Sequence, residues 1–469
     1  MKRLAFAGLF LGMALLLTAC PTEPPPPPPP TSCIPTPTVL SAQGFGSQGV
    51  VPQGLGDFSA PHVPGELLVL PGALTPQGLA ARVEGVRPLS ALEGGFLRVQ
   101  VPRGQERAKA EALLRAGARF VQPNYLYFPL YAPSDPLYTV SPTDSSRLKS
   151  YLDLLYMEAA WDLVRSQAYG CTPVVAVLDT VFNRAHEDAG LFLPGYNATQ
   201  DGLGESNLDP SPPPSGYSYM NNDPDHGQGV AGLVAAVADN GKGVPGLGLN
   251  RVKVLPIKVF YWVAGSYAST SQVLADAIRY AADQGAAVIN LSLGSTTPLD
   301  GVVQNALNYA LSKGSLPVAA AGNDGTDGLM YPAAYPGVLA VGSARLDGTR
   351  SDFSNYSTTP RDLVLAPGGN QNPPQTLHVL ALGRDYPYYQ SPGRYVAQAG
   401  TSFAAPMVSA VAALYVAHYH AVRGQAPTVS QVKQCLIQTA ANGGQYDAQT
   451  GYGLVQADRV LSDATYCFP

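Results

Sequence analysis

The sequence has little of what nucleic-acid-binding proteins need, and its first apolar run is short. The formal net charge is only −5 over 469 residues, and neither a basic cluster nor a platform of aromatic residues stands out, so we expect no nucleic-acid partner. The apolar run of residues 4–17 is shorter than the roughly 20 residues that a spanning helix needs. We therefore expect no permanent membrane span from this run.

Cysteine is scarce, with five residues in the whole chain. Such a set fits a protein that is exported to an oxidising compartment. If Cys20 carries a lipid, Cys33, Cys171, Cys435 and Cys467 remain and allow three pairings. Our preferred bridge joins Cys435, on a predicted helix, to Cys467, near the end of the chain. Cys33 lies in the predicted tether, where it can be a free thiol instead of part of a disulfide.

The first residues have the features of an export signal. Lys2 and Arg3 precede the apolar run, which ends in small residues before Cys20, so residues 1–19 are predicted to be a signal peptide. Residues 17–20, Leu-Thr-Ala-Cys, resemble the lipobox of bacterial lipoproteins. This resemblance implies cleavage before Cys20 and a lipid on its sulfur, which would anchor the exported protein to a membrane. Ordinary signal cleavage and secretion are the alternative.

Two segments separate this signal from the large C-terminal region. Residues 20–58 are rich in Pro, Gly and Gln and contain an unbroken proline run, which predicts an extended tether rather than a packed domain. Residues 59–132 alternate strand-like and helix-like pieces, which predicts a small α+β domain. The polar linker of residues 129–143 offers an exposed site for proteolysis.

The remaining chain, residues 133–469, is long enough for one large domain. Short apolar strands alternate in it with longer amphipathic segments, which predicts an α/β fold, a doubly wound parallel sheet with helices on both faces. The predicted strands are residues 174–178, 252–259, 287–293 and 316–321, and the predicted helices include 270–284 and 301–313. In such sheets the functional residues gather at the carboxyl ends of the strands, where Asp179 and Asn323 would lie.

A short motif near the C-terminus organises the chain. Gly400-Thr-Ser-Phe-Ala-Ala-Pro406 is followed by an apolar run of small residues, 408–417, which predicts a buried helix. Pro406 suits a first helical turn, so we expect Ser402 just ahead of the helix. The positive end of the helix dipole would favour a nucleophile there. The alternative from the residues alone is that Thr401 and Ser402 merely cap the helix.

This motif resembles the active-site serine segment of the subtilisin-like serine proteases, the subtilases, G-T-S-x-A-x-P. Asp179-Thr180 resembles the aspartate segment of that family, and residues 225–234 resemble its histidine segment with His226 retained. Ala-Ala-Gly-Asn323 resembles its A-A-G-N segment. The order Asp, His, Ser is that of subtilisin.

The chain departs from the family at three positions near these residues. Val181 stands where the family usually has Gly, and Gln228 and Gly229 replace the usual Thr and His. His186, in a second histidine segment, resembles a structural position of the family rather than the catalytic one.

The resemblance implies a serine endopeptidase with Asp179, His226 and Ser402 as its triad. His226 would be the base, Asp179 would orient it, and Asn323 would donate to the oxyanion. No metal or organic cofactor takes part in that chemistry. A monomer is expected.

Residues 290–295 resemble the family's substrate-binding strand. The backbone of Ser292, Leu293 and Gly294 would pair with an extended peptide, and the small residues Gly294, Ala320 and Gly322 would leave room for a side-chain pocket.

Residues 59–132 resemble the inhibitory propeptide of subtilases, which implies a self-processing proenzyme whose own propeptide binds it. A permanent accessory domain is the alternative. Many subtilases bind structural calcium, and the carboxylates of Asp201, Glu205, Asp209, Asp223 and Asp225 could supply ligands; solvated carboxylates are the alternative reading.

Other functions compete with the protease. The departures at Val181, Gln228 and Gly229 motivate an inactive subtilase-like surface protein that binds peptides without cutting them. An esterase or peptide ligase could use the same acyl-enzyme. The insert of residues 370–396, rich in Pro, Gly and Tyr, could shape the substrate groove or cover the surface.

Overall fold

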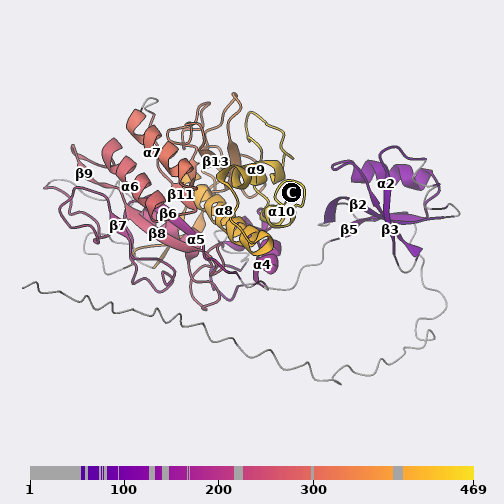
Figure 1. Ribbon diagram of the computed structural model, residues 1–469, viewed down its shortest axis with the longest axis horizontal. Helices are drawn as coiled ribbons and strands as arrows, with labels where there is room; N and C mark the ends of the chain where they lie inside the picture. The colour runs from indigo at the N-terminus through magenta and orange to yellow at the C-terminus, as the bar shows by residue number, and fades with distance from the viewer. Residues whose placement is uncertain are drawn as a thin grey trace, which may run out of the picture. The chain divides into compact units, whose positions relative to one another are not determined.

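The computed structural model shows two compact units, one within residues 1–126 and the other within residues 127–469 (Figure 1). The structure describes residues 54–56, 58, 62–72, 75, 78, 82–92, 95–125, 133–139, 147–165, 167, 169–215, 225–296, 300–383 and 394–468. The predicted signal peptide, Cys20, Cys33 and Asp223 lie outside these residues, as does most of the predicted tether.

The first unit is a small α+β domain. Its sheet has five strands in the order β1-β5-β2-β4-β3. The strands are β1 (Gly54–Leu55), β2 (His62–Leu70), β3 (Arg87–Ala91), β4 (Leu97–Gln100) and β5 (Phe120–Tyr125), and the helix is α2 (Glu106–Arg115). Alternate residues of β2, Leu67 and Val69, pack with Leu113 of α2 in its core, as the two-residue period of a strand dictates.

The second unit is built on a parallel sheet of seven strands in the order β14-β13-β12-β11-β6-β8-β7. The strands are β6 (Val174–Asp179), β7 (Tyr196–Asn197), β8 (Lys253–Lys258), β11 (Val288–Leu291), β12 (Leu316–Ala320), β13 (Leu339–Ala344) and β14 (Leu363–Pro367). This sheet, with helices packed on it, confirms the predicted doubly wound α/β fold.

Helices cover both faces of this sheet. The helices α5 (Asp225–Ala235) and α8 (Thr401–Arg423) pack on one face, and α6 (Ser271–Asp283) and α7 (Gly301–Ser312) lie side by side on the other (Figure 1). The buried residues of β6 alternate between the two cores, with Val175 facing the first and Ala176 facing the second. A strand that is buried on both faces must be apolar throughout, which is why residues 174–178 form an unbroken apolar run.

Smaller elements complete this unit. They are α3 (Lys149–Asp153), α4 (Met157–Arg165), α9 (Val429–Thr439), α10 (Ala457–Ser462), and the two hairpins β9 (Tyr261–Val263) with β10 (Ser266–Ala268) and β15 (Leu377–Leu380) with β16 (Tyr395–Gln398). A disulfide joins Cys435 of α9 to Cys467, and Cys171 is a free, half-buried thiol among the described cysteines.

The central helix begins earlier than the sequence predicts. Gly400 has φ of 151° and ends the extended segment, and α8 starts at Thr401. Ser402 is therefore the second residue of the helix rather than the residue ahead of it, and Pro406 lies inside the helix rather than in its first turn. By length and composition α8 could cross a membrane, but 89% of its most apolar window is buried, so it is the core helix of this unit.

Candidate active site

The carboxyl end of β6 holds a buried acid against an imidazole. Asp179 is the last residue of β6 and has no exposed surface. Its Oδ1 lies 2.7 Å from Nδ1 of His226, the second residue of α5, and it also accepts the Thr180 N–H at 2.7 Å. A ring nitrogen beside a carboxylate carries the proton, so this contact leaves Nε2 on the opposite side of the ring as the basic atom.

The family departures near this pair are accommodated by local contacts. The Gln228 side chain is fully buried, and its Oε1 accepts the Asn183 N–H at 2.8 Å, which ties the loop after Asp179 to α5. A Cβ atom on Gly229 would lie only 2.8 Å from Cγ2 of Val379 on β15. The strand β15 therefore occupies the space that a larger residue at position 229 would need.

The insert of residues 370–396 is hydrogen-bonded to the segments that carry Asp179 and His226. The N–H of Leu382, just after β15, donates to Oδ1 of Asp225 at 2.6 Å. The carbonyl of Leu382 accepts a hydrogen bond from Nδ2 of Asn183 at 2.8 Å. The segment around Leu382 therefore helps to hold the loop after Asp179 next to the start of α5. The sequence motifs did not identify Asn183 or Leu382 for that role.

Ser402 lies at the start of α8, close to the imidazole. The ring of Phe403, the next residue, has its centroid 5.4 Å from that of His226. The Ser402 side chain is partly exposed, and its Oγ donates to the Ser292 carbonyl at 3.3 Å. The Asp179–His226 pair of β6 and α5 thus contacts the first turn of α8, which also bears Ser402.

Two hydrogen-bond donors, Nδ2 of Asn323 and the Ser402 N–H, lie beside Gly400. The Oδ1 atom of Asn323 accepts both the N–H and the hydroxyl of Thr401 at 2.9 Å, so the orientation of its amide is fixed. A Cβ atom on Gly400 would lie 3.6 Å from Nδ2 of Asn323 and 3.7 Å from the backbone nitrogen of Ser402. Because Ser402 is in the first turn of α8, its N–H has no intrahelical acceptor. The Asn323 amide nitrogen and the Ser402 N–H therefore lie near the same point beside Gly400.

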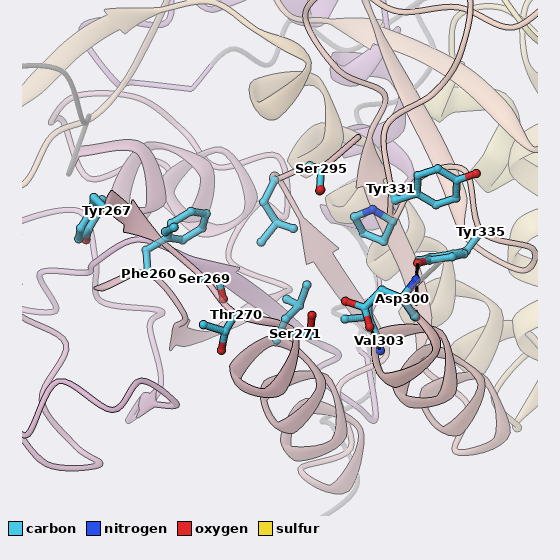
Figure 2. A pocket seen from close by; sticks show the side chains of 15 residues that line it. Phe260, Tyr267, Ser269, Thr270, Ser271, Ser295, Asp300, Val303, Tyr331 and Tyr335 are labelled. Atoms are coloured by element: carbon cyan, nitrogen blue, oxygen red, sulfur yellow. Dashed lines mark hydrogen bonds between the residues drawn. The ribbon is translucent and has the colours of Figure 1, made fainter. Parts of the chain in front are cut away.

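The predicted substrate strand follows β11 and borders a cavity of about 300 Å³ (Figure 2). Leu293 and Gly294 line this cavity together with aromatic side chains and the first residues of α6 and α7. The aromatic residues are Phe260, Tyr267, Tyr331 and Tyr335. Figure 2 also shows the Tyr335 hydroxyl held by the N–H of Asp300 at 2.9 Å. The cavity can accept an apolar side chain of an extended ligand.

Met330 occupies space that was expected to form a side-chain pocket beside Gly294 and Gly322. A Cβ atom on Gly294 would lie 2.9 Å from Sδ of Met330, and one on Gly322 would lie 2.8 Å from its Cγ. Ala320 is buried in the core cluster of α8. Met330, which the sequence analysis missed, therefore fills the gap between Gly294 and Gly322.

One of the carboxylates proposed for calcium, that of Asp201, is already engaged. The Asp201 Oδ2 atom pairs with the fully buried ammonium of Lys258 at 2.5 Å and accepts the Ser211 hydroxyl at 2.6 Å. Although burial alone would raise the pKa of Asp201, these bonds outweigh it and hold the pKa well below its usual range. Within the described ranges no group of three or more His, Cys, Asp or Glu residues could hold a metal. Asp201 does not fit a calcium site, because Lys258 already supplies the positive charge beside it. Calcium at the other carboxylates stays a prediction.

His186 lies apart from the triad candidates. Its Nε2 contacts the Arg394 carbonyl at 2.8 Å, and its Nδ1 accepts the Asp188 N–H at 3.1 Å. Burial lowers the pKa of this imidazole, as expected for a neutral, structural histidine.

Comparisons with known proteins identify the family of this chain. The model of the Subtilase family matches residues 170–453. The thermophilic serine proteinase of Bacillus sp. (strain AK1) is 32% identical over 328 residues, which cover 68% of this chain and 67% of that protein. Thermitase of Thermoactinomyces vulgaris is 31% identical over 311 residues, which cover 66% of this chain and 92% of that protein. A solved structure of proteases from Pseudoalteromonas arctica PAMC 21717 covers 71% of this chain and 100% of its own, with 29% identity and a TM-score of 0.58.

The matched family region spans more than half of the chain and contains the residues at the carboxyl ends of β6 and β12 and at the starts of α5 and α8. The chain therefore belongs to the subtilase family and is a subtilisin-like serine endopeptidase, an enzyme that hydrolyses peptide bonds in polypeptide substrates.

Proposed function

We propose that this subtilase cuts polypeptides with Asp179, His226 and Ser402 as its catalytic triad and Asn323 as an oxyanion donor. The observation that carries the proposal is the 2.7 Å contact between the buried Asp179 carboxylate and His226 Nδ1, beside the start of the helix that bears Ser402. The contact orients Nε2 of His226 as a base for the serine hydroxyl.

The reaction then follows from these positions. The Ser402 hydroxyl turns from the Ser292 carbonyl to Nε2 of His226, loses its proton to that nitrogen and attacks the scissile carbonyl carbon. The resulting oxyanion accepts from Nδ2 of Asn323 and the Ser402 N–H. His226 returns the proton to the leaving amine. A water then gives a proton to His226 and attacks the acyl carbon, and His226 passes this proton to Ser402 Oγ as the ester C–O bond breaks, which releases the acid and restores the hydroxyl. Besides the peptide and that water, these steps use side chains and backbone of the chain.

The substrate binds as an extended strand in this proposal. The backbone of Ser292, Leu293 and Gly294 pairs with the peptide, which makes binding largely independent of peptide sequence. One side chain of the peptide enters the cavity of about 300 Å³ beside Leu293. Met330 limits the space near Gly294 and Gly322, so the nearest substrate side chain is small.

Catalysis is tested by substitution of the nucleophile. Casein digestion is followed for the wild type, for Ser402→Ala and for Ser312→Ala, a control in which an exposed helix serine is removed. We expect Ser402→Ala to lose at least 10³-fold in rate and Ser312→Ala to match the wild type. A folded, mature wild type that does not digest casein would favour the inactive peptide-binding protein instead.

The protein is made as an exported proenzyme in this proposal. The unit within residues 1–126 folds as its own α+β body, as an inhibitory propeptide must. Residues 1–19 direct export, and a lipid on Cys20 anchors the chain to a membrane. Mass measurement of wild type and Ser402→Ala tests self-processing: only the wild type is expected to be cleaved between residues 125 and 140.

A further inference from the structure

Pro406 leaves one backbone acceptor of α8 without its helical donor. In an α-helix the N–H of residue i bonds to the carbonyl of residue i−4, so the donor for the Ser402 carbonyl would be the N–H of residue 406. Proline has no N–H. In its place the Ser292 hydroxyl donates to the Ser402 carbonyl at 2.7 Å.

The Ser292 hydroxyl is itself fixed by a buried relay. Asn290 Nδ2 donates to Ser292 Oγ at 2.9 Å, and the Ser409 hydroxyl donates to Asn290 Oδ1 at 2.9 Å. The side chains lie in the core: Asn290 and Ser409 are 0% exposed and Ser292 is 3% exposed. Ser409 and Ser402 are two helical turns apart and therefore share one face of α8. The hydrogen bonds thus connect Ser409 of α8 through Asn290 of β11 and Ser292 back to Ser402 of α8.

The contact between Ser292 and Ser402 runs in both directions. The Ser292 hydroxyl donates to the Ser402 carbonyl, and the Ser402 hydroxyl donates to the Ser292 carbonyl at 3.3 Å. On the other side of Ser402, the Thr401 N–H is held by Asn323 at 2.9 Å. The backbone around Ser402 is therefore pinned from both sides.

We propose that Ser292 is a positioning residue for the nucleophile and that Pro406 makes this possible by withholding the competing helical donor. This inference rests on the proposed role of Ser402 as the nucleophile. The Ser292 hydroxyl fixes the Ser402 carbonyl, and through the Cα atom it sets the direction of the Ser402 hydroxyl and of its N–H toward the oxyanion. The Asn290 and Ser409 side chains keep the Ser292 hydroxyl aimed at that carbonyl, in a dry interior where hydrogen bonds are strong.

A double-substitution cycle tests the inference. Ser292→Ala leaves the Ser402 carbonyl without this donor, and we expect kcat to fall roughly ten- to a hundredfold, as for a backbone acceptor left unsatisfied, while KM changes less than threefold. Pro406→Ala restores an N–H at position 406, which can bond to the same carbonyl. We therefore expect Ser292→Ala/Pro406→Ala to recover at least half of the lost kcat on a logarithmic scale. Ser292→Thr, which keeps a hydroxyl, should stay within about threefold of the wild type.

The outcomes separate this inference from the proposed function. An unchanged kcat in Ser292→Ala, or a double variant no faster than Ser292→Ala, would overturn the role of Ser292. Should Ser292→Ala not fold, the double variant decides: near-wild-type turnover supports the inference, and turnover below one-hundredth of the wild type contradicts it. If Ser402→Ala itself retains wild-type turnover, the proposed function fails, whatever the Ser292 variants show.

Discussion

At the residue scale, one side chain fills the space beside the proposed substrate strand. Met330 packs against the positions where Gly294 and Gly322 would carry a Cβ atom. Its removal opens space next to the strand that is proposed to bind the substrate backbone.

We therefore expect Met330→Ala to shift the preference toward a larger side chain before the cut. One or two methylenes of pocket space are worth about 1–3 kcal/mol, so the ratio of kcat/KM for Phe over Ala peptides should rise roughly tenfold or more. Peptide anilides that differ only in that residue measure the ratio. The matched control is Val302→Ala, on an exposed part of α7; an equal shift in both variants would contradict the assignment.

The pairing of Lys258 with Asp201 is the second feature at this scale. Both side chains are buried, and the ammonium also donates to the Asp209 carbonyl at 2.6 Å. Removal of one partner of a buried pair leaves an uncompensated charge, which typically costs about 3–5 kcal/mol.

Lys258→Met should therefore strongly lower the free energy of unfolding. The pKa of Asp201 is lower in the folded protein than its usual value, so the pair stabilises the protein above the unfolded pKa of about 4 and this stabilisation is lost as the pH falls. Denaturant unfolding in the Ser402→Ala background, which avoids self-digestion, measures both effects. A stability equal to that of the parent at pH 7 would contradict a structural role for this pair.

At the scale of elements, β15 and α5 are fitted to each other. Gly229 and Gly232 of α5 lie under Val379 and Leu380 of β15, where added Cβ atoms would come within 2.8 and 2.7 Å of those side chains. The strand thus packs on the helix that carries His226.

Gly229→His restores the residue that the family usually has, yet we expect it to destabilise this protein. Overpacking of a buried site typically costs about 1–3 kcal/mol, and the additional strain would displace His226. Thermal unfolding in the Ser402→Ala background and kcat in the active enzyme measure the two effects. Val379→Gly in the same chain should restore part of each; no change in either measurement upon Gly229→His would show that the packing is not tight.

Much of this element structure could be predicted from the sequence. The unbroken apolar run before Asp179 indicated a buried parallel strand, and the Gly400 to Pro406 motif led to the helix that bears Ser402. The start of α8 could not be predicted correctly, because Pro406 favours a first turn by local preference. The Ser292 hydroxyl, which donates to the Ser402 carbonyl, lies 110 residues away in the sequence. The contacts of Gln228 with Asn183 and of Met330 with Gly294 likewise depend on distant segments that no local pattern reports.

At the scale of the whole molecule, the parallel sheet gathers the candidate residues from distant parts of the chain. Asp179 ends β6 and Asn323 follows β12, while His226 and Ser402 lie at the starts of α5 and α8. We propose that this assembly makes one serine, Ser402, a nucleophile.

The most direct measurement of that claim is the residue labelled by a serine-directed phosphonate. The mature enzyme is treated with the reagent, and the adduct is located by peptide mass mapping, with Ser402→Ala as the matched control. The account predicts one adduct per chain on Ser402 and none in the variant. An adduct on another residue, or a folded wild type that does not react, would contradict it.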